Sequence, residues 1–467
     1  MNDLIAREMW EYDQRVRVEW LDIFASFSVA ILILFFAWMY QNRMMIRDQS
    51  YKHYMGGLAA KVFGTFFFCT IYVFYYQGGD TIAYFESAMA MVNLFYQSPA
   101  KYFEVLFSTP SIEVRSLFSD KTGYPYAYLF YESHTFMVIK LTSVISIITN
   151  KSYFLTSLLI SSASYYGIWK LFLTFRRYAP EIEDKLAWAC LYFPSPLFWA
   201  GGVSKDTYTF MGTALFVYCA HQFFILKRRK TQIVILLLIS SWLILSIKPY
   251  IFMVLFPGGL LWIFYDKLSK IRSQFVSFVL FPIMIVVISG LSYFVLTNLS
   301  SSLDKFSVDK AFETAAATNN DLKQDYYGGS SFDIGSFDGS GSDAIKLALP
   351  AINAGLFRPA IYESRSVVLL LAGLENTFLL LFTIYVIFKA RPKGFFGIIT
   401  KNPLLLFCII YSILFAYMIG ITTSNFGALV RFKIPLIPFY VSSLFIIYFL
   451  STQKRRTLKT EAELGEG

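Results

Sequence analysis

Two glycines and an aspartate, Gly78, Gly79 and Asp80, end a long apolar run that opens near Lys61. Flanking glycines let a backbone approach a bound molecule closely, and a carboxylate beside them can serve as a general base. A plain surface turn is the alternative, because Gly-Gly-Asp is also common turn chemistry. We take Asp80 as the candidate catalytic residue and, if a divalent cation is used, as its ligand.

Basic side chains near the ends of other apolar runs suit an anionic substrate. A lone cation at a membrane interface can bind a phosphate, although a snorkelling anchor is the alternative. Arginines beside aromatic residues suit a pyrophosphate or a sugar phosphate. The candidate substrate-binding residues are Lys205, Lys248, Arg358, Arg365, Arg431 and Lys433, together with Glu132 and His134.

Structural roles stay open for several of these residues. Lys248 precedes Pro249, and this pair also fits a mere tight turn between two helices. Glu363 and Arg365 also fit a surface ion pair, which would stabilise little. His134 also fits an ordinary hydrogen-bonded histidine at an interface.

The elements that must position these residues are membrane helices. The 467 residues are 56% hydrophobic and only 15% charged, whereas a soluble protein is about a quarter charged. Runs of 17 or more apolar residues match the length needed to cross a bilayer, and their lack of alternation excludes a membrane β-barrel. We expect an all-α polytopic protein with about eleven spans, near 20–41, 61–77, 153–175, 186–201, 206–226, 231–247, 250–266, 274–297, 366–389, 402–421 and 434–451.

Basic linkers set the expected orientation. The linkers 227–230 (KRRK) and 454–459 (KRRTLK) mark the cytoplasmic side by the positive-inside rule. Segment 1–19 is then external, the membrane domain covers 20–451, and the tail 452–467 is cytoplasmic. This parity requires that segment 134–149 is re-entrant or interfacial; if it crossed, every upstream assignment would invert.

Two long external loops follow from this topology, at 78–152 and 298–365. In the first loop, apolar residues at helical spacing predict an amphipathic helix at the interface, with a second short helix over 99–108. All the candidate site residues fall on the external face. Their gathering there favours a site for an anionic, lipid-linked substrate.

The charge and cysteine patterns exclude other classes. A net charge of +10 marks cytoplasmic loops in a membrane protein, so we expect membrane lipids and no nucleic acid as partners. The four cysteines lie in apolar runs and fit buried hydrophobic positions. No cofactor is expected beyond a possible divalent cation.

The chain resembles the polytopic GT-C glycosyltransferases and the related bacterial polysaccharide polymerases of the O-antigen type. The resemblance rests on 78–84 (GGDTIAY), 193–207 (FPSPLFWAGGVSKDT) and 429–439 (LVRFKIPLIPF). It implies a GT-C-like fold and an enzyme of the bacterial inner membrane. Its donor would be a sugar on polyprenyl phosphate or pyrophosphate, and its acceptor a glycan or lipid-glycan in surface polysaccharide assembly.

Carried over, Asp80 matches the acid of the first loop and Arg431 the basic residue before a Pro-x-x-Pro span. Two departures stand out: the usual acid pair is a single Asp80, and an extra span, 20–41, precedes it. The O-antigen-type polymerase is therefore an alternative. A transporter or flippase for lipid-linked glycans, or a membrane subunit of an export complex, is an alternative from another class.

Overall fold

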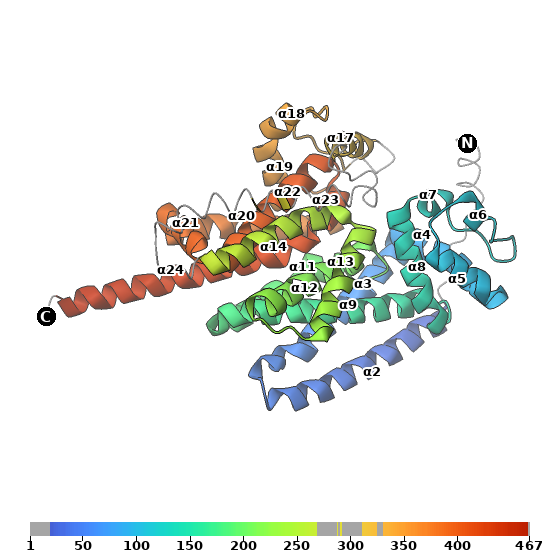
Figure 1. Cartoon of the computed structure of the whole chain (residues 1–467), viewed down its shortest axis with the longest axis horizontal. Coiled ribbons are helices and arrows are strands. Elements are labelled where there is room, and N and C mark those ends of the chain that lie inside the picture. Colours follow the sequence, from blue (N-terminus) through green and yellow to red (C-terminus); the bar gives the residue numbers. More distant parts are fainter. Residues whose placement is uncertain (1–18, 269–286, 288–289, 292–310, 325–329, 466–467) are drawn as a thin grey trace. The chain divides into compact units, whose positions relative to one another are not determined.

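The regular structure of this chain is helical. The computed structural model describes residues 19–268, 287, 290–291, 311–324 and 330–465 (Figure 1). Within these residues, α-helices alternate with short 3₁₀ and π-helical turns, and the β-type pairings are two isolated bridges. The expected all-α class is confirmed. The expected external segment 1–19 and the span 274–297 lie almost entirely outside the described residues.

Six helices are long and apolar enough to cross a membrane. They are Trp20–Met45, Gln49–Tyr75, Pro249–Leu268, Val367–Ala390, Pro403–Thr422 and Phe426–Gln453. Each overlaps an expected span, which confirms a membrane protein with several spanning helices. The expected total of about eleven is not reached among the described residues.

The expected span 186–201 is broken. It consists of α10 (Glu183–Ala187), a π-helical turn (Trp188–Tyr192) and α11 (Pro194–Trp199). Phe193, between the last two, is extended with ψ 129°. A residue before proline is pushed out of the helical region, and Phe193 precedes Pro194, so the prolines account for the break.

The chain divides into two compact units. Unit 1 contains 1–170, 196–215 and 239–248, and unit 2 contains 171–195, 216–238 and 249–467. The boundary runs through three long helices, which are α9 (Tyr153–Tyr178), α12 (Lys205–Ala220) and α13 (Thr231–Ile247). Each unit is described separately below.

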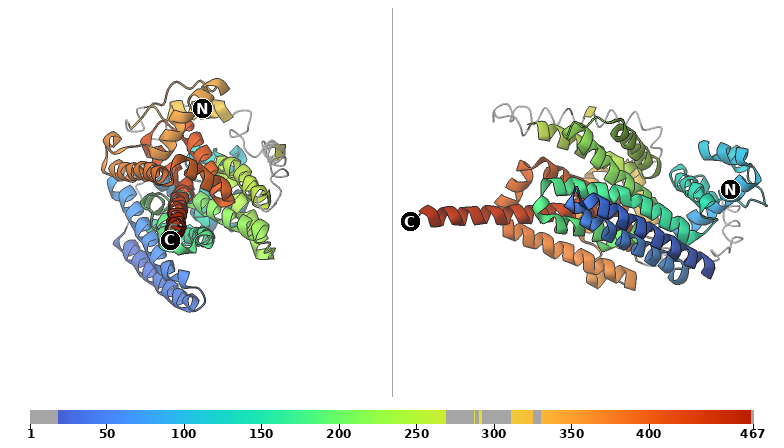
Figure 2. Two further views of the ribbon diagram at one scale, coloured as in Figure 1. Left: turned by 90° about the vertical axis from the view of Figure 1, so that its left-hand side faces the viewer. Right: turned by 90° about the horizontal axis from the view of Figure 1, so that it is seen from below.

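In unit 1, α2 (Trp20–Met45) lies beside α3 (Tyr54–Thr70), as Figures 1 and 2 show. The rings of Phe27 and Phe66 stack with their centroids 4.3 Å apart. A π-helical turn, Ile71–Tyr75, continues α3 towards the two glycines at 78 and 79. These helices carry the chain to the first loop.

The first loop is built around α4 (Asp80–Gln97). It packs against α5 (Pro99–Phe107) and α8 (Ser133–Ile148), so the expected helices near 82–95 and 99–108 are both present. However, α4 is buried on most sides rather than on one face, and Met91 and Val92 are fully buried. The sequence shows the helical period of α4. It does not show that α8, which follows some 40 residues later, covers a second side of α4.

A sharp turn separates α8 from α9, whose axes differ by 111°. Asn150 and Lys151 make this turn with φ of 49° and 63°. Asn tolerates the left-handed region better than most residues because its short side chain can hydrogen-bond locally. Segment 134–149 is therefore a helix separate from the next long one, and its non-crossing position stays a prediction.

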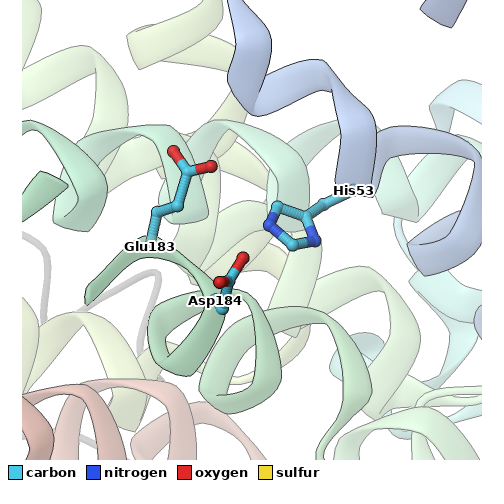
Figure 3. A group of neighbouring side chains, drawn as sticks. All are labelled: His53, Glu183 and Asp184. Carbon is cyan, nitrogen blue, oxygen red and sulfur yellow. The ribbon is translucent and has the colours of Figure 1, made fainter. Parts of the chain in front are cut away.

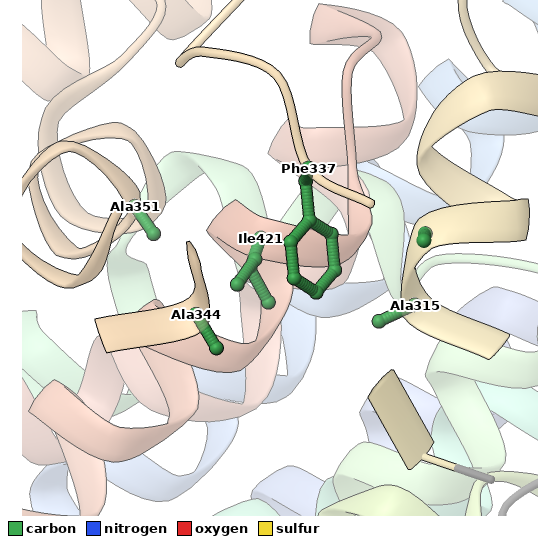
Figure 4. Close-up of a cluster of buried hydrophobic side chains, with 6 residues drawn as sticks. Ala315, Phe337, Ala344, Ala351 and Ile421 are labelled. Atoms are coloured by element: carbon green, nitrogen blue, oxygen red, sulfur yellow. The ribbon is translucent and has the colours of Figure 1, made fainter. Parts of the chain in front are cut away.

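Unit 2 is organised around α22 (Pro403–Thr422). It packs against α14 (Pro249–Leu268), α19 (Ala348–Phe357) and α24 (Ile437–Gly465). Near one end of α22, Phe337 and Ile421 form a small apolar cluster with alanines from α17 (Ala311–Asp321), α18 (Gly341–Lys346) and α19 (Figure 4). Part of the long loop 298–365 is thereby ordered against the helices.

Small residues bring α19 and α22 into backbone contact. Ala351 and Gly355 on α19 face Ala416 and Gly420 on α22, each pair four residues apart. A Cβ added at Gly355 would collide with the Ala416 carbonyl oxygen, and one at Gly420 with the Ala351 carbonyl oxygen. This is the small-residue spacing by which membrane helices approach closely.

We predict that Gly355→Ala or Gly420→Ala lowers the free energy of unfolding by about 1–3 kcal/mol, because added volume at a tight contact forces the backbone to move. Thermal unfolding in detergent measures this loss. Gly397→Ala on α21 (Pro392–Lys401) is the matched control, since nothing lies within 4 Å of its added Cβ. Equal midpoints for all three variants would contradict the packing argument.

Candidate functional site

Asp80 is the first residue of α4 and is exposed. Gly79 before it caps the helix with φ 100° and ψ 177°, a conformation that other residues rarely adopt. A Cβ at Gly79 would also lie 3.0 Å from the ring of Tyr72. The glycine is thus required for the chain to enter α4 here. The carboxylate sits at the positive end of the helix dipole.

Lys205, at the start of α12, lies beside two of the predicted acids. Its Nζ is 3.2 Å from Glu132 Oε2 and donates a hydrogen bond to Thr135. Burial lowers the pKa of Lys205, while the negative charges of Glu132 and Asp80 oppose that shift. The structure therefore brings Asp80, Glu132 and Lys205 into one electrostatic cluster, although they come from three distant stretches of sequence.

Lys248 pairs with Asp206, the residue that follows Lys205 on α12. Its Nζ lies 2.6 Å from Asp206 Oδ1, with side chains only 6% and 1% exposed. Two consecutive residues, Lys205 and Asp206, thus form ion pairs of opposite polarity. The chain turns at Lys248 between α13 and α14, which is the tight turn considered from the sequence. The Lys248 ammonium pairs with Asp206, and both residues belong to unit 1.

The loop before Lys205 is held by a residue that sequence reasoning did not single out. Lys61 of α3 is buried and donates to the carbonyl oxygens of Ala200 (2.5 Å) and Pro196 (3.4 Å). Ser204 Oγ then accepts from the backbone N–H of Thr207 at 3.1 Å, as expected for a helix cap. A charged residue inside a membrane helix is itself a signal of such a role.

His134 is buried, and its Nδ1 lies 3.1 Å from the carbonyl oxygen of Ser246. This contact agrees with the hydrogen-bonded alternative stated for it. Through it, α8 is linked to the end of α13, next to the Asp206–Lys248 pair. His134 therefore helps to hold the start of α8, next to Glu132, against the end of α13.

A second acid, Glu86, lies near Asp80 and was not predicted. It accepts a hydrogen bond from the Tyr126 hydroxyl at 2.7 Å, and burial raises the pKa of Glu86 to about 7. Burial, followed by the charges of Asp80 and Glu86, raises the pKa of Tyr128 to about 12. Both carboxylates therefore act on the same phenol. In the sequence, the one sign of Glu86 is that an acidic residue stands within the mostly apolar segment that forms α4.

The remaining predicted residues belong to unit 2. The Arg358 guanidinium bonds Glu363 Oε1 (2.8 Å from Nε) and lies 4.6 Å from the ring centroid of Phe332. Glu363, considered from the sequence as a partner of Arg365, pairs with Arg358. The reason is a turn over 361–363 that directs the carboxylate back to Arg358.

Lys433 is buried in unit 2 and donates to Arg358 O (2.7 Å) and Asn376 Oδ1 (3.1 Å). It holds the segment that carries Arg358 against α20 (Val367–Ala390). Arg365 is exposed and Arg431 is half-buried. Arg358 is half-buried as well, so among these four predicted cations Lys433 is the buried one.

Acids near a histidine are the usual sign of a metal centre. Glu183 and Asp184 occupy the first turn of α10 (Figure 3). Glu183 also accepts a hydrogen bond from Arg176 Nε at 2.6 Å. The third residue drawn there, His53, belongs to unit 1. Use of a divalent cation by Asp80 stays a prediction.

Comparison of the chain with protein-family models, with curated proteins and with solved structures gives no match.

We predict that Lys248→Met lowers the free energy of unfolding by about 3–5 kcal/mol, because it leaves the Asp206 carboxylate buried without its counter-charge. Adding Asp206→Leu should restore most of this loss. Lys346→Met is the control, since its pair with Asp343 is largely exposed, 74% at the lysine, and should change little. Denaturant unfolding in detergent measures all four proteins, and equal losses for Lys248→Met and Lys346→Met would contradict the assignment.

Proposed function

We propose that this protein is a membrane glycosyltransferase. It transfers a sugar from a polyprenyl phosphate or pyrophosphate carrier to a glycan or lipid-glycan acceptor, on the external side of the bacterial inner membrane. The observation that supports this proposal is the cluster of Asp80, Glu132 and Lys205 in unit 1. Asp80 is an exposed carboxylate on a glycine turn, and its negative charge acts on Lys205, whose pKa burial lowers. A carboxylate and an ammonium of this kind suit a hydroxyl and a phosphate.

Lys205 binds the phosphate of the donor. Its pair with Glu132 is longer than the Lys248–Asp206 pair, 3.2 Å against 2.6 Å, and both side chains remain about a quarter exposed. A partly exposed pair is stabilised little, so the ammonium can exchange Glu132 for a phosphate oxygen at small cost. The bound anion favours the charged form of the lysine and thereby offsets the effect of burial.

Asp80 orients the acceptor. Its carboxylate accepts a hydrogen bond from the acceptor hydroxyl, whose oxygen attacks the anomeric carbon. The bond between that carbon and the phosphate oxygen breaks, and the phosphate leaves with the electron pair, stabilised by Lys205. The hydroxyl proton passes to a carboxylate of the cluster. A single displacement of this kind inverts the anomeric centre and needs no covalent intermediate.

Unit 2 adds accessible cations of its own. Arg365 and Arg431 are proposed to bind lipid phosphate, because a guanidinium offers a planar fork of donors to an oxyanion. Arg358 and Lys433 hold the unit together instead, through Glu363 and Asn376.

We predict that Asp80→Asn and Lys205→Met each reduce sugar transfer by about 10²–10³-fold, because each removes charge from the reacting groups. The full chain, reconstituted in vesicles, is given a panel of short polyprenyl-phosphate monosaccharides with oligosaccharide acceptors. Release of polyprenyl phosphate and the product masses are measured. Asp120→Asn and Lys121→Met make the same chemical changes at exposed positions of unit 1 and should retain full activity.

The products also separate the alternatives. One added sugar indicates a transferase, whereas a ladder of repeats indicates a polymerase. Donor that crosses the vesicle membrane without cleavage indicates a transporter. Full transfer activity in both Asp80→Asn and Lys205→Met would remove the proposed site.

A further inference from the structure

A short helix of unit 2, α21, joins two candidate spans, α20 and α22. Its 10 residues rise about 15 Å, roughly half of what a bilayer crossing needs. Both of its ends are turns. Arg391 before it has a φ of 61°, and Asn402 after it caps α22 by accepting from the N–H of Leu404 at 3.1 Å. Because α21 joins two helices that are expected to cross, and is too short to cross itself, we expect it at one face of the membrane.

One side of α21 packs inside unit 2. It contacts α20, α22 and α24, and Figure 1 shows it beside α20. Ile399 on this side is only 5% exposed. The hydroxyl of Tyr265, near the end of α14, donates to the backbone carbonyl oxygen of Thr400. These contacts determine which side of the helix faces outward.

The outward side of α21 carries an aromatic ring between two lysines. Lys393, Phe396 and Thr400 are spaced by three and four residues, so they share one side of the helix, and all three are exposed. The exposed fraction of Phe396 is 66%. Lys401 is exposed at the last position of the helix. A large apolar side chain flanked by lysines on a short surface helix is typical of a helix that lies in the interface of a bilayer.

The end of α20 continues this pattern at the turn that leads into α21. Phe388 is 76% exposed, Lys389 is half-buried and Arg391 is exposed. Two exposed rings and four cations are therefore gathered within 14 consecutive positions, 388–401. We call them the α21 surface: Phe388, Lys389, Arg391, Lys393, Phe396 and Lys401.

The positive charge of the α21 surface is not balanced by nearby acids. Residues 376–460 contain no aspartate or glutamate. In the part of the chain that the structure describes, none of the four cations takes part in an ion pair. The end of α14, which Tyr265 brings to α21, adds Asp266 and Lys267, whose formal charges cancel. The charge is therefore available to an anionic partner.

We propose that the α21 surface docks on anionic phospholipids, with Phe388 and Phe396 at the boundary between headgroups and acyl chains and the four cations against the phosphates. Cations within a Debye length of an anionic bilayer, about 8–10 Å, are attracted to it. An acidic protein segment would satisfy the cations alone, whereas an anionic lipid at a membrane face satisfies both the cations and the rings. This inference does not depend on the proposed sugar transfer.

Photo-crosslinking in a bilayer of defined composition tests the proposal. The full chain carries a benzophenone amino acid in place of Phe396. It is reconstituted in vesicles that contain equal amounts of phosphatidylglycerol and phosphatidylcholine with the same acyl chains. After irradiation, the masses of the crosslinked peptides give the ratio of the two lipids beside position 396. We expect phosphatidylglycerol to exceed phosphatidylcholine by about fivefold or more, since one cation near an anionic surface favours binding by about fivefold.

Removal of charge should remove this preference. Lys393→Gln combined with Lys401→Gln should lower the ratio by about fivefold or more, toward one. Salt at about 1 M should act in the same direction, because the Debye length falls to about 3 Å. The matched control is Lys323→Gln combined with Lys346→Gln. These two lysines of unit 2 already pair with acids, so the ratio should stay unchanged.

Every outcome decides for or against the proposal. Abundant lipid adducts at a ratio near one indicate an ordinary lipid-facing surface and overturn the role of the cations, as does an unchanged ratio in the Lys393→Gln, Lys401→Gln variant. Adducts with protein alone overturn docking on the membrane. Equal thermal midpoints of the variants and the unsubstituted chain show that a lowered ratio does not come from unfolding. No sugar donor is present, so the result is independent of the proposed transferase activity.

Discussion

Two neighbouring charges of opposite sign, Lys205 and Asp206, determine how unit 1 is assembled. Lys205 pairs with Glu132, the residue that begins α8, and Asp206 pairs with Lys248 at the junction of α13 and α14. Buried charges are tolerated when paired, so three helix ends must meet at one place. The positions of His134 and Lys61 follow from this requirement, because both tie the adjoining backbone to the same region.

The two ion pairs differ in burial and in length. Lys248 and Asp206 are almost fully buried at 2.6 Å, and the shielding makes their attraction strong and permanent. Lys205 and Glu132 are partly open to solvent at 3.2 Å, so each can exchange its partner. The start of α12 thus combines one buried ion pair with one that is partly open to solvent.

Local features were predictable from sequence, whereas partners were not. Apolar length predicted the six candidate spans. The partners of Lys205 and Lys248 lie 73 and 42 residues away, and no local pattern encodes such distances. Glu86 was missed because its burial depends on the 124–128 segment folding back over α4. Residue types singled out Asp80 and Lys205 as candidates, and only tertiary packing could supply what surrounds them.

α2 is packed differently from the other helices of unit 1. The buried residues of α2 are all small: Ser26, Ala30 and Ala37, which share one face. Trp20, Leu21 and Ile31 are at least 67% exposed. α2 therefore contributes almost no large side chains to the interior of unit 1. The outward face of α2 can thus change in sequence, to suit the lipid or protein around it, with little effect on the packing inside unit 1.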